Sequence, residues 1–254
     1  MNKNLTTVIM AAGKGKRMKN PDKSKVMFEL YGKPMIEYVT NLALKINSDF
    51  IIPIVGHQKQ TVIDFLSNKY SSVSEKLKFA HQDEQLGTGH AVMQTEPLLN
   101  NFEGDVLILS GDVPLLTYET VLSFLNYHNS NGFKATLISA VFENPTGYGR
   151  IIRDENNNFI DIVEDKDASP QQKNITEINS GIYIVDSKLL FEALKSLKTD
   201  NAQGEYYLTD IFRYFKNKNI KIGAIPVSDK NEITGINTVE QLEELEKIYI
   251  NKNE

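Results

Sequence analysis

The sequence predicts an α/β protein in which a doubly wound, mainly parallel sheet is joined to a smaller β-rich lobe. Up to Phe142, short apolar runs of strand length alternate with longer segments of helical period. This alternation is typical of a parallel sheet covered by helices on both faces. Beyond Asn144 the pattern changes to that of a β-hairpin. With 254 residues, of which 41% are apolar and 24% charged, the chain is long enough to bury a core of its own.

The first part of the chain supplies most of the predicted sheet. Strands are expected at 5–12, 50–55, 78–82, 105–110 and 134–142, and helices at 34–46, 58–69, 89–99 and 117–129. Pro34 suits the first position of a helix because its missing N–H has no helical partner there. Thr117 suits an N-cap because its hydroxyl can accept a hydrogen bond from an amide of the first turn.

The second part supplies the predicted lobe and the end of the chain. A hairpin is expected from strands 150–153 and 159–163, joined by the polar turn 154–158. A strand at 182–185, helices at 189–197 and 208–215, and a strand at 220–227 follow. We expect a single domain over 1–254, made of a first part at about 1–143, a lobe at about 144–230 and a C-terminal helix at about 238–250.

Composition and charge exclude several classes of protein. Lys and Arg number 28 and Asp and Glu 33, which gives a formal net charge of −5 and argues against general binding to nucleic acid or membrane surfaces. The absence of cysteine excludes disulfides, a thiol nucleophile and thiolate metal sites. No apolar run approaches the roughly 20 residues that span a bilayer. We expect a cytoplasmic protein.

The loop after the first strand is a candidate phosphate site. In open α/β sheets, ligands bind beyond the carboxyl ends of the strands. Gly13 and Gly15 allow close approach of the backbone to an anion, and Arg17 and Lys25 add positive charge. The spacing matches neither the Walker loop nor the Rossmann fingerprint. Taken alone, the pattern fits equally a glycine turn with solvated cations.

A second candidate lies after the buried strand 105–110. Asp112 would reach the same edge of the sheet as the first loop. Mg²⁺ that accompanies a nucleotide is usually held by one or two carboxylates and by phosphate oxygens. Asp112 is therefore a candidate Mg²⁺ ligand, with a structural turn before Pro114 as the alternative.

Several long motifs in a fixed order match a known family. They lie at 8–18, 25–26, 32–34, 85–91, 145–151, 164–168, 177–179 and 201–210. With them the sequence resembles the sugar-1-phosphate nucleotidyltransferases, and in particular the uridyltransferase domain of bacterial N-acetylglucosamine-1-phosphate uridyltransferase. The resemblance spans about residues 5–245, nearly the whole chain.

This resemblance implies a Rossmann-like nucleotidyltransferase fold with a nucleotide-binding first part and a sugar-binding lobe. It implies that UTP and N-acetylglucosamine 1-phosphate are converted to UDP-N-acetylglucosamine and pyrophosphate, with Mg²⁺ as cofactor. By this resemblance, Arg17 would bind the triphosphate and Lys25 would neutralise the α-phosphoryl group. Asp112 and Asn237 would hold Mg²⁺.

The remaining roles implied by the resemblance concern the two substrates. Main-chain contacts to the nucleotide would come from Ala11, Ala12, Gly13 and Gly15. Contacts to the uracil would come from Gln82, Gln85, Gly87 and Thr88. The sugar site would be lined by Gly149, Glu164, Asn179, Tyr207 and Thr209.

Departures from the family pattern leave two alternatives open. Ser110 stands where tyrosine is usual and Ser24 where proline is usual, so another sugar phosphate or another NTP remains possible as substrate. A nucleotide-sugar binding module without turnover is the alternative from another class. No hexapeptide repeat is present, so no acetyltransferase β-helix domain is expected within 1–254. A monofunctional enzyme and a part of a longer bifunctional chain both fit this sequence.

Overall fold

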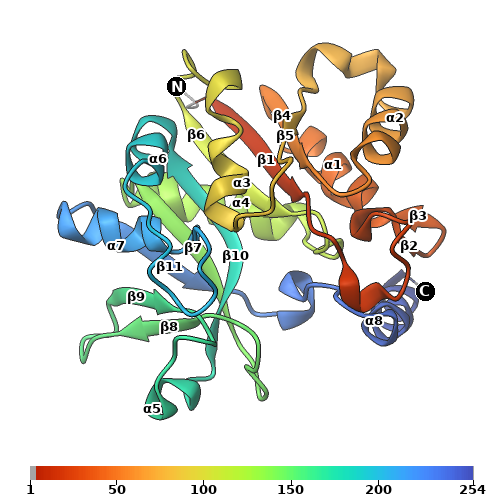
Figure 1. The fold of residues 1–254 in the computed structure, drawn as a ribbon. Coiled ribbons are helices and arrows are strands. Elements are labelled where there is room, and N and C mark those ends of the chain that lie inside the picture. Colours follow the sequence, from red (N-terminus) through yellow and green to blue (C-terminus); the bar gives the residue numbers. More distant parts are fainter. Residues whose placement is uncertain (1–3, 254) are drawn as a thin grey trace.

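A mixed sheet forms the centre of the protein (Figure 1). The structure, a computed structural model, describes residues 4–253. Within these residues the sheet has nine strands, seven of them in the order β11-β7-β10-β6-β1-β4-β5. These seven are β1 (Leu5–Ala11), β4 (Phe50–Val55), β5 (Ala80–His81), β6 (Asp105–Ser110), β7 (Ala135–Val141), β10 (Glu177–Asp186) and β11 (Ile222–Pro226).

Among these seven strands the pairing is mainly parallel, as the sequence predicts, with one antiparallel strand near the middle. β1 pairs in parallel with β4 and β6, β4 with β5, and β11 with β7. β10 runs antiparallel to both β6 and β7. The predicted strand at 182–185 is too short, because β10 begins at Glu177 and continues through a register shift between Asn179 and Tyr183.

The predicted hairpin is present and joins the sheet at the first half of β10. β8 (Arg150–Arg153) and β9 (Phe159–Val163) pair antiparallel, and β8 joins β10 through the pair Ile178–Arg150. In Figure 1 this hairpin lies at the lower left, beside the short helix α5 (Pro170–Lys173). A small separate hairpin is formed by β2 (Glu29–Leu30) and β3 (Lys33–Pro34).

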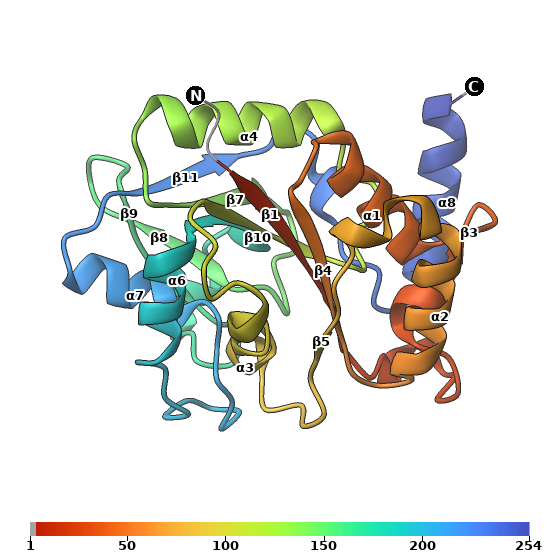
Figure 2. The same ribbon diagram turned by 90° about the horizontal axis from the view of Figure 1, so that it is seen from above.

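Helices cover both faces of the sheet (Figure 2). The remaining helices are α1 (Met35–Lys45), α2 (Lys59–Lys69), α3 (Thr88–Met93), α4 (Tyr118–Ser130), α6 (Ser187–Leu194), α7 (Asp210–Asn217) and α8 (Val239–Asn253). Figure 2 shows α4 on one side of the sheet and α3 and α6 on the opposite side. The doubly wound arrangement is therefore confirmed.

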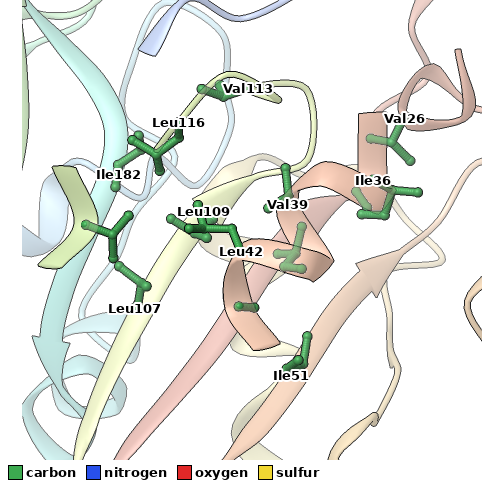
Figure 3. Packing of buried hydrophobic residues seen from close by; sticks show 14 of the residues in the cluster. Val26, Ile36, Val39, Leu42, Ile51, Leu107, Leu109, Val113, Leu116 and Ile182 are labelled. Atoms are coloured by element: carbon green, nitrogen blue, oxygen red, sulfur yellow. The ribbon is translucent and has the colours of Figure 1, made fainter. Parts of the chain in front are cut away.

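Both faces of the strands are buried, so apolar residues alternate between two cores. Leu107 and Leu109 pack with Val39 and Leu42 of α1 on one face (Figure 3). Their neighbours in β6, Val106 and Ile108, belong to the second core with residues of α3, α6 and α7. This period of two explains why the strands are apolar without interruption in the sequence.

Several helix limits differ from the predicted ones for local reasons. Pro34 is the N-cap residue of α1 rather than its first position, because it pairs with Glu29 in the small hairpin. The predicted helix at 89–99 ends at Met93, and a separate 3-10 turn with Pro97 near its start follows. The prediction of Thr117 as an N-cap is confirmed, since its hydroxyl accepts a hydrogen bond from the amide of Thr120. Within the described residues, no helix has the length and apolar character needed to cross a membrane.

Candidate active site

The first loop and Asp112 meet at the carboxyl ends of two adjacent strands. β1 and β6 are paired as far as Met10 and Ser110, and the amide of Gly111 donates to the carbonyl of Met10 at 2.9 Å. A cavity of about 320 Å³ opens at this edge. We call it the larger cavity, because a smaller one described below adjoins it. Its lining includes Ala11, Ala12, Gly13, Lys25, Gln82, Gln85, Gly87, Thr88, Ser110 and Asp112.

Gly15 permits Lys25 to lie against the first loop. Its φ of +57° is in the left-handed region, which side chains rarely adopt. A Cβ atom at this position would lie 2.8 Å from the Cβ of Lys25. Gly15 does not line the cavity itself, so in this structure its contact is with Lys25.

Four side chains converge beside the larger cavity, and we call them the polar cluster: Arg17, Lys25, Asp112 and Asn237. The Nζ atom of Lys25 donates to Oδ2 of Asp112 and, at 2.8 Å, to Oδ1 of Asn237. Arg17 donates to the same Asn237 oxygen at 2.8 Å. The chain therefore brings together both predicted cations and both predicted metal ligands.

Local hydrogen bonds fix Asn237 in the cluster. The amide of Ile236 donates to the carbonyl of Asp112 at 2.9 Å, which joins the two segments. The side chain of Gln241 accepts from the amides of Asn237 and Thr238 at the start of α8, and Thr238 caps the amide of Gln241 in return. The first turn of α8 thus holds Asn237 in place.

The donor set of the polar cluster suits a hard cation. One ammonium group contacts oxygens of both Asp112 and Asn237, so the two oxygens point at a common position where positive charge is accommodated. The described residues contain no group of three or more His, Cys, Asp or Glu side chains that could hold a metal. A Mg²⁺ ion at Asp112 and Asn237 would therefore complete its shell with substrate oxygens and water, as it prefers.

Gln82 presents an amide to the larger cavity from a buried position. Only 4% of its surface is exposed, and its Nε2 donates to the carbonyl of Gly87 at 3.0 Å. Its Oε1 is then the side-chain atom left to accept a hydrogen bond from a ligand. Gly87 has φ of +112°, and a Cβ there would lie 2.6 Å from the carbonyl oxygen of Tyr206.

The loop around Gly87 is fixed to a distant segment. Tyr206 donates its amide to the carbonyl of Leu86 at 2.8 Å and accepts at its own carbonyl from Gly89 at 2.7 Å. The hydroxyl of Thr88 accepts from the amide of Leu208 at 3.0 Å. The loop that lines the larger cavity is therefore preorganised rather than free.

A second cavity, of about 200 Å³, adjoins the first, and we call it the smaller cavity. Met10, Thr88 and Ser110 line both cavities. Four residues of the predicted sugar site line the smaller cavity: Gly149, Glu164, Asn179 and Thr209. Tyr207 does not; its hydroxyl lies 3.2 Å from Oδ2 of Asp167, and burial beside this carboxylate raises the pKa of Tyr207 to about 12.

Glu164 is the acidic group of the smaller cavity. Burial raises the pKa of Glu164, and the carboxylates of Asp210, Asp167 and Asp165 act in the same direction. A hydrogen bond of 3.0 Å from Thr209 partly opposes this shift. The smaller cavity thus offers the desolvated carboxylate of Glu164 as a hydrogen-bond acceptor. Asn179 lines the same cavity, and its Nδ2 donates to the hydroxyl of Tyr183 at 2.7 Å.

The sequence-based prediction of the site missed several lining residues, among them Met10 and Tyr148. Met10, a half-buried residue near the end of β1, forms part of the wall between the cavities, and its place in the motif 8–18 was the available signal. Tyr148 lines the smaller cavity. Burial and then the nearby charge of Asp112 raise the pKa of Tyr148. Its position between Gly147 and Gly149, in one of the recognised motifs, was the available signal.

Cations and a carboxylate gathered at the carboxyl ends of β1 and β6 are typical of the ligand site of a doubly wound α/β protein. The chain belongs to the nucleotidyl transferase family, whose model matches residues 6–230.

Curated relatives agree with this membership. The chain is 49% identical over 244 residues to the bifunctional protein GlmU of Thermoanaerobacter pseudethanolicus, covering 96% of this chain and 51% of that protein. It is 43% identical over 241 residues to the GlmU protein of Streptococcus mutans, covering 95% of this chain and 51% of that protein. The chain thus spans about half the length of these relatives.

Solved structures share the fold at low sequence identity. A UDP-glucose pyrophosphorylase complexed with UDP-glucose superposes with a TM-score of 0.78 at 20% identity, over 99% of this chain and 100% of that one. A putative glucose-1-phosphate thymidylyltransferase from Bacillus anthracis gives a TM-score of 0.77 at 21% identity, over 96% and 94% of the two chains. The predicted fold class is confirmed.

Proposed function

We propose that the protein transfers a uridylyl group from UTP to N-acetylglucosamine 1-phosphate, with Mg²⁺ as cofactor and pyrophosphate as the second product. One observation carries this proposal: two cavities of different chemistry share a wall, and the polar cluster lies beside it. The larger cavity suits a nucleotide and the smaller one a hydroxylated sugar. The order of the family motifs supports the choice of these substrates.

The larger cavity would hold the nucleotide. Main chain at Ala11, Ala12 and Gly13 would contact the ribose and phosphates, while the 82–88 loop would contact the base. Oε1 of Gln82 is an acceptor that could pair with the N3–H of uracil, whereas cytosine offers an acceptor at that position. This polarity favours uracil over cytosine, while thymine, which has the same N3–H, is separated from uracil only by the substrate grid below.

The chemistry requires positioning and neutralisation of charge more than covalent participation. An oxygen of the sugar phosphate would attack the α-phosphorus, the bond to the bridging oxygen of the β-phosphate would break, and pyrophosphate would leave. Lys25 would neutralise the α-phosphoryl oxygens, and Arg17 the leaving pyrophosphate. Asp112 and Asn237 would hold Mg²⁺, which supplies further positive charge to the phosphates when bound.

Pyrophosphate release from the purified protein tests this proposal. UTP, CTP, dTTP and ATP would each be combined with the 1-phosphates of N-acetylglucosamine, N-acetylgalactosamine, glucose and glucosamine. Turnover restricted to UTP with N-acetylglucosamine 1-phosphate is expected. Preference for another pair would replace the proposed substrates, with Ser110 in the shared wall as the first residue to examine. Silence across the whole grid would favour a binding module.

The metal assignment has its own test. Asp112→Asn keeps the shape of the side chain but removes its charge. It should raise the Mg²⁺ concentration that gives half-maximal turnover. An unchanged Mg²⁺ titration would reject Asp112 as a direct ligand.

A further inference from the structure

Arg150 is a fully buried arginine in the hairpin beside the smaller cavity. Only 2% of its surface is exposed, and it is among the largest side chains that are fully buried. Arginine is rarely buried to this extent unless it is paired. Arg150 does not line either cavity.

The guanidinium of Arg150 joins two segments that are separate in the sequence. One terminal nitrogen donates to the carbonyl oxygen of Tyr148. The other donates at 2.9 Å to Oδ1 of Asp165, whose side chain is 26% exposed. The planar fork of an arginine can satisfy two such acceptors at once, which a single ammonium group cannot do with the same geometry.

Both partners of Arg150 lie next to lining residues of the smaller cavity. Tyr148 lines it directly and is followed by Gly149, whose carbonyl accepts from the amide of Asn179 at 2.8 Å. Asp165 follows Glu164, the acidic group of the cavity. The backbone of Arg150 pairs with Val163 and with Ile178, the residues just before Glu164 and Asn179.

Stability alone does not account for this arrangement. A buried ion pair contributes little net stability, because desolvation of the two charges offsets their attraction. Within the described part of the chain, Nε of Arg150 has no hydrogen-bond partner, which is a further cost. An apolar side chain would fill the same space without either penalty, but it could not hold the two segments at a fixed separation.

We propose that the Arg150–Asp165 ion pair is a positioning brace that sets the distance between the Tyr148–Gly149 wall and the Glu164 wall of the smaller cavity. Arg150 is then a positioning residue for the sugar phosphate and contacts no substrate. The expected effect on the KM of the sugar phosphate rests on the proposed function. The expected effect on the order of the two cavity walls does not.

Kinetics of Arg150→Lys and Asp165→Asn test the brace. Arg150→Lys removes the planar fork, and Asp165→Asn removes the negative charge of its acceptor, while each keeps a polar side chain of similar size. The KM for N-acetylglucosamine 1-phosphate should rise about tenfold, as is common when an outer residue that orients a binding group is lost. The KM for UTP should stay within about twofold, because neither Arg150 nor Asp165 lines the larger cavity.

Arg153→Lys is the matched control. Arg153 lies on the same strand and makes a bidentate pair with Glu177 at 2.7 Å for both bonds, and neither residue lines the cavities. This variant should lower thermal stability without changing the ratio of the two KM values. Equal KM changes in the Arg150 and Arg153 variants would overturn the proposal, as would an unchanged sugar-phosphate KM in both brace variants.

Amide hydrogen exchange tests the positioning role of Arg150 independently of the proposed function. If the wild-type protein shows no turnover with these substrates, the proposed function fails, and exchange still tests the brace. Faster exchange at 147–149 and 164–168 in Arg150→Lys and Asp165→Asn, absent from Arg153→Lys, is expected. Exchange that is unchanged at both segments, or raised uniformly over the protein, would refute the brace.

Discussion

Replacing Lys25 with methionine should strengthen metal binding while weakening catalysis. In the structure the ammonium group of Lys25 contacts both proposed Mg²⁺ ligands, so it competes with a metal for the same two oxygens. The side chains of Lys25 and Asp112 are only 13% and 22% exposed, so this contact is shielded from water. The variant removes the competing ammonium group and keeps most of the length of the side chain.

The magnitude follows from the bonds that a metal must displace. A hydrogen bond to a charged group contributes about 1.5–3 kcal/mol. At about 1.4 kcal/mol per factor of ten, Lys25→Met should bind a divalent cation between roughly 10-fold and 100-fold more tightly. Loss of a cation at the reacting phosphate should lower kcat by about 100-fold or more.

Titration with Mn²⁺, followed by the electron paramagnetic resonance signal of the free ion, measures this affinity without nucleotide. Lys59→Met is the control, because Lys59 pairs with Asp83 at an exposed position, with the two side chains 42% and 72% exposed. The control should leave Mn²⁺ affinity unchanged. Equal or weaker Mn²⁺ binding by Lys25→Met would refute competition at the polar cluster.

Three further predictions concern single residues. Arg17→Ala should lower kcat/KM at least 100-fold, about 2.7 kcal/mol, and steady-state kinetics near wild type would reject its role. Gly87→Ala should raise the KM for UTP, because the new Cβ would press on the backbone of Tyr206, and an unchanged value would show that the 82–88 loop does not contact the nucleotide. Burial raises the pKa of Glu164 above its ordinary 4.5, so this carboxylate takes up a proton earlier as pH falls. The sugar-phosphate KM should therefore rise in the wild type as pH falls through this raised pKa, and the rise should be absent from Glu164→Gln; parallel profiles would exclude Glu164.

The pH dependence of stability should follow the same group. The folded protein binds a proton at Glu164 more tightly than the unfolded chain, so this residue's contribution to stability falls as pH rises through the raised pKa. Glu164→Gln should lose that contribution to the pH dependence, as urea unfolding at several pH values would measure.

The alternation of apolar runs was sufficient to predict the sheet, because strands buried on both faces have few polar interruptions. It was insufficient for β10, whose first half contains Asn179, Ser180 and Gly181 and therefore lacks an apolar run. Its antiparallel direction depends on pairing with β6 and β7, which no local pattern encodes.

For the site, family motifs predicted which residues gather, but not how each side chain is directed. Gly149, Glu164 and Thr209 line one cavity, whereas the hydroxyl of Tyr207 is directed to Asp167. The brace was also outside the prediction, because the pairing of Arg150 with Asp165 depends on how β8 and β9 fold together. The motifs predict which residues lie near the site, but the tertiary packing determines which side-chain atoms are in contact.

Asn237 reaches Arg17 across 220 positions of the chain, and this separation affects the order of folding. A fragment ending at residue 230, the limit of the family match, would contain all the strands of the described sheet but neither Asn237 nor α8. Contacts between distant positions form late, because closing a long loop costs entropy before the contact is made. During refolding, turnover should therefore return after the sheet has formed, since the last helix must dock before the polar cluster is complete.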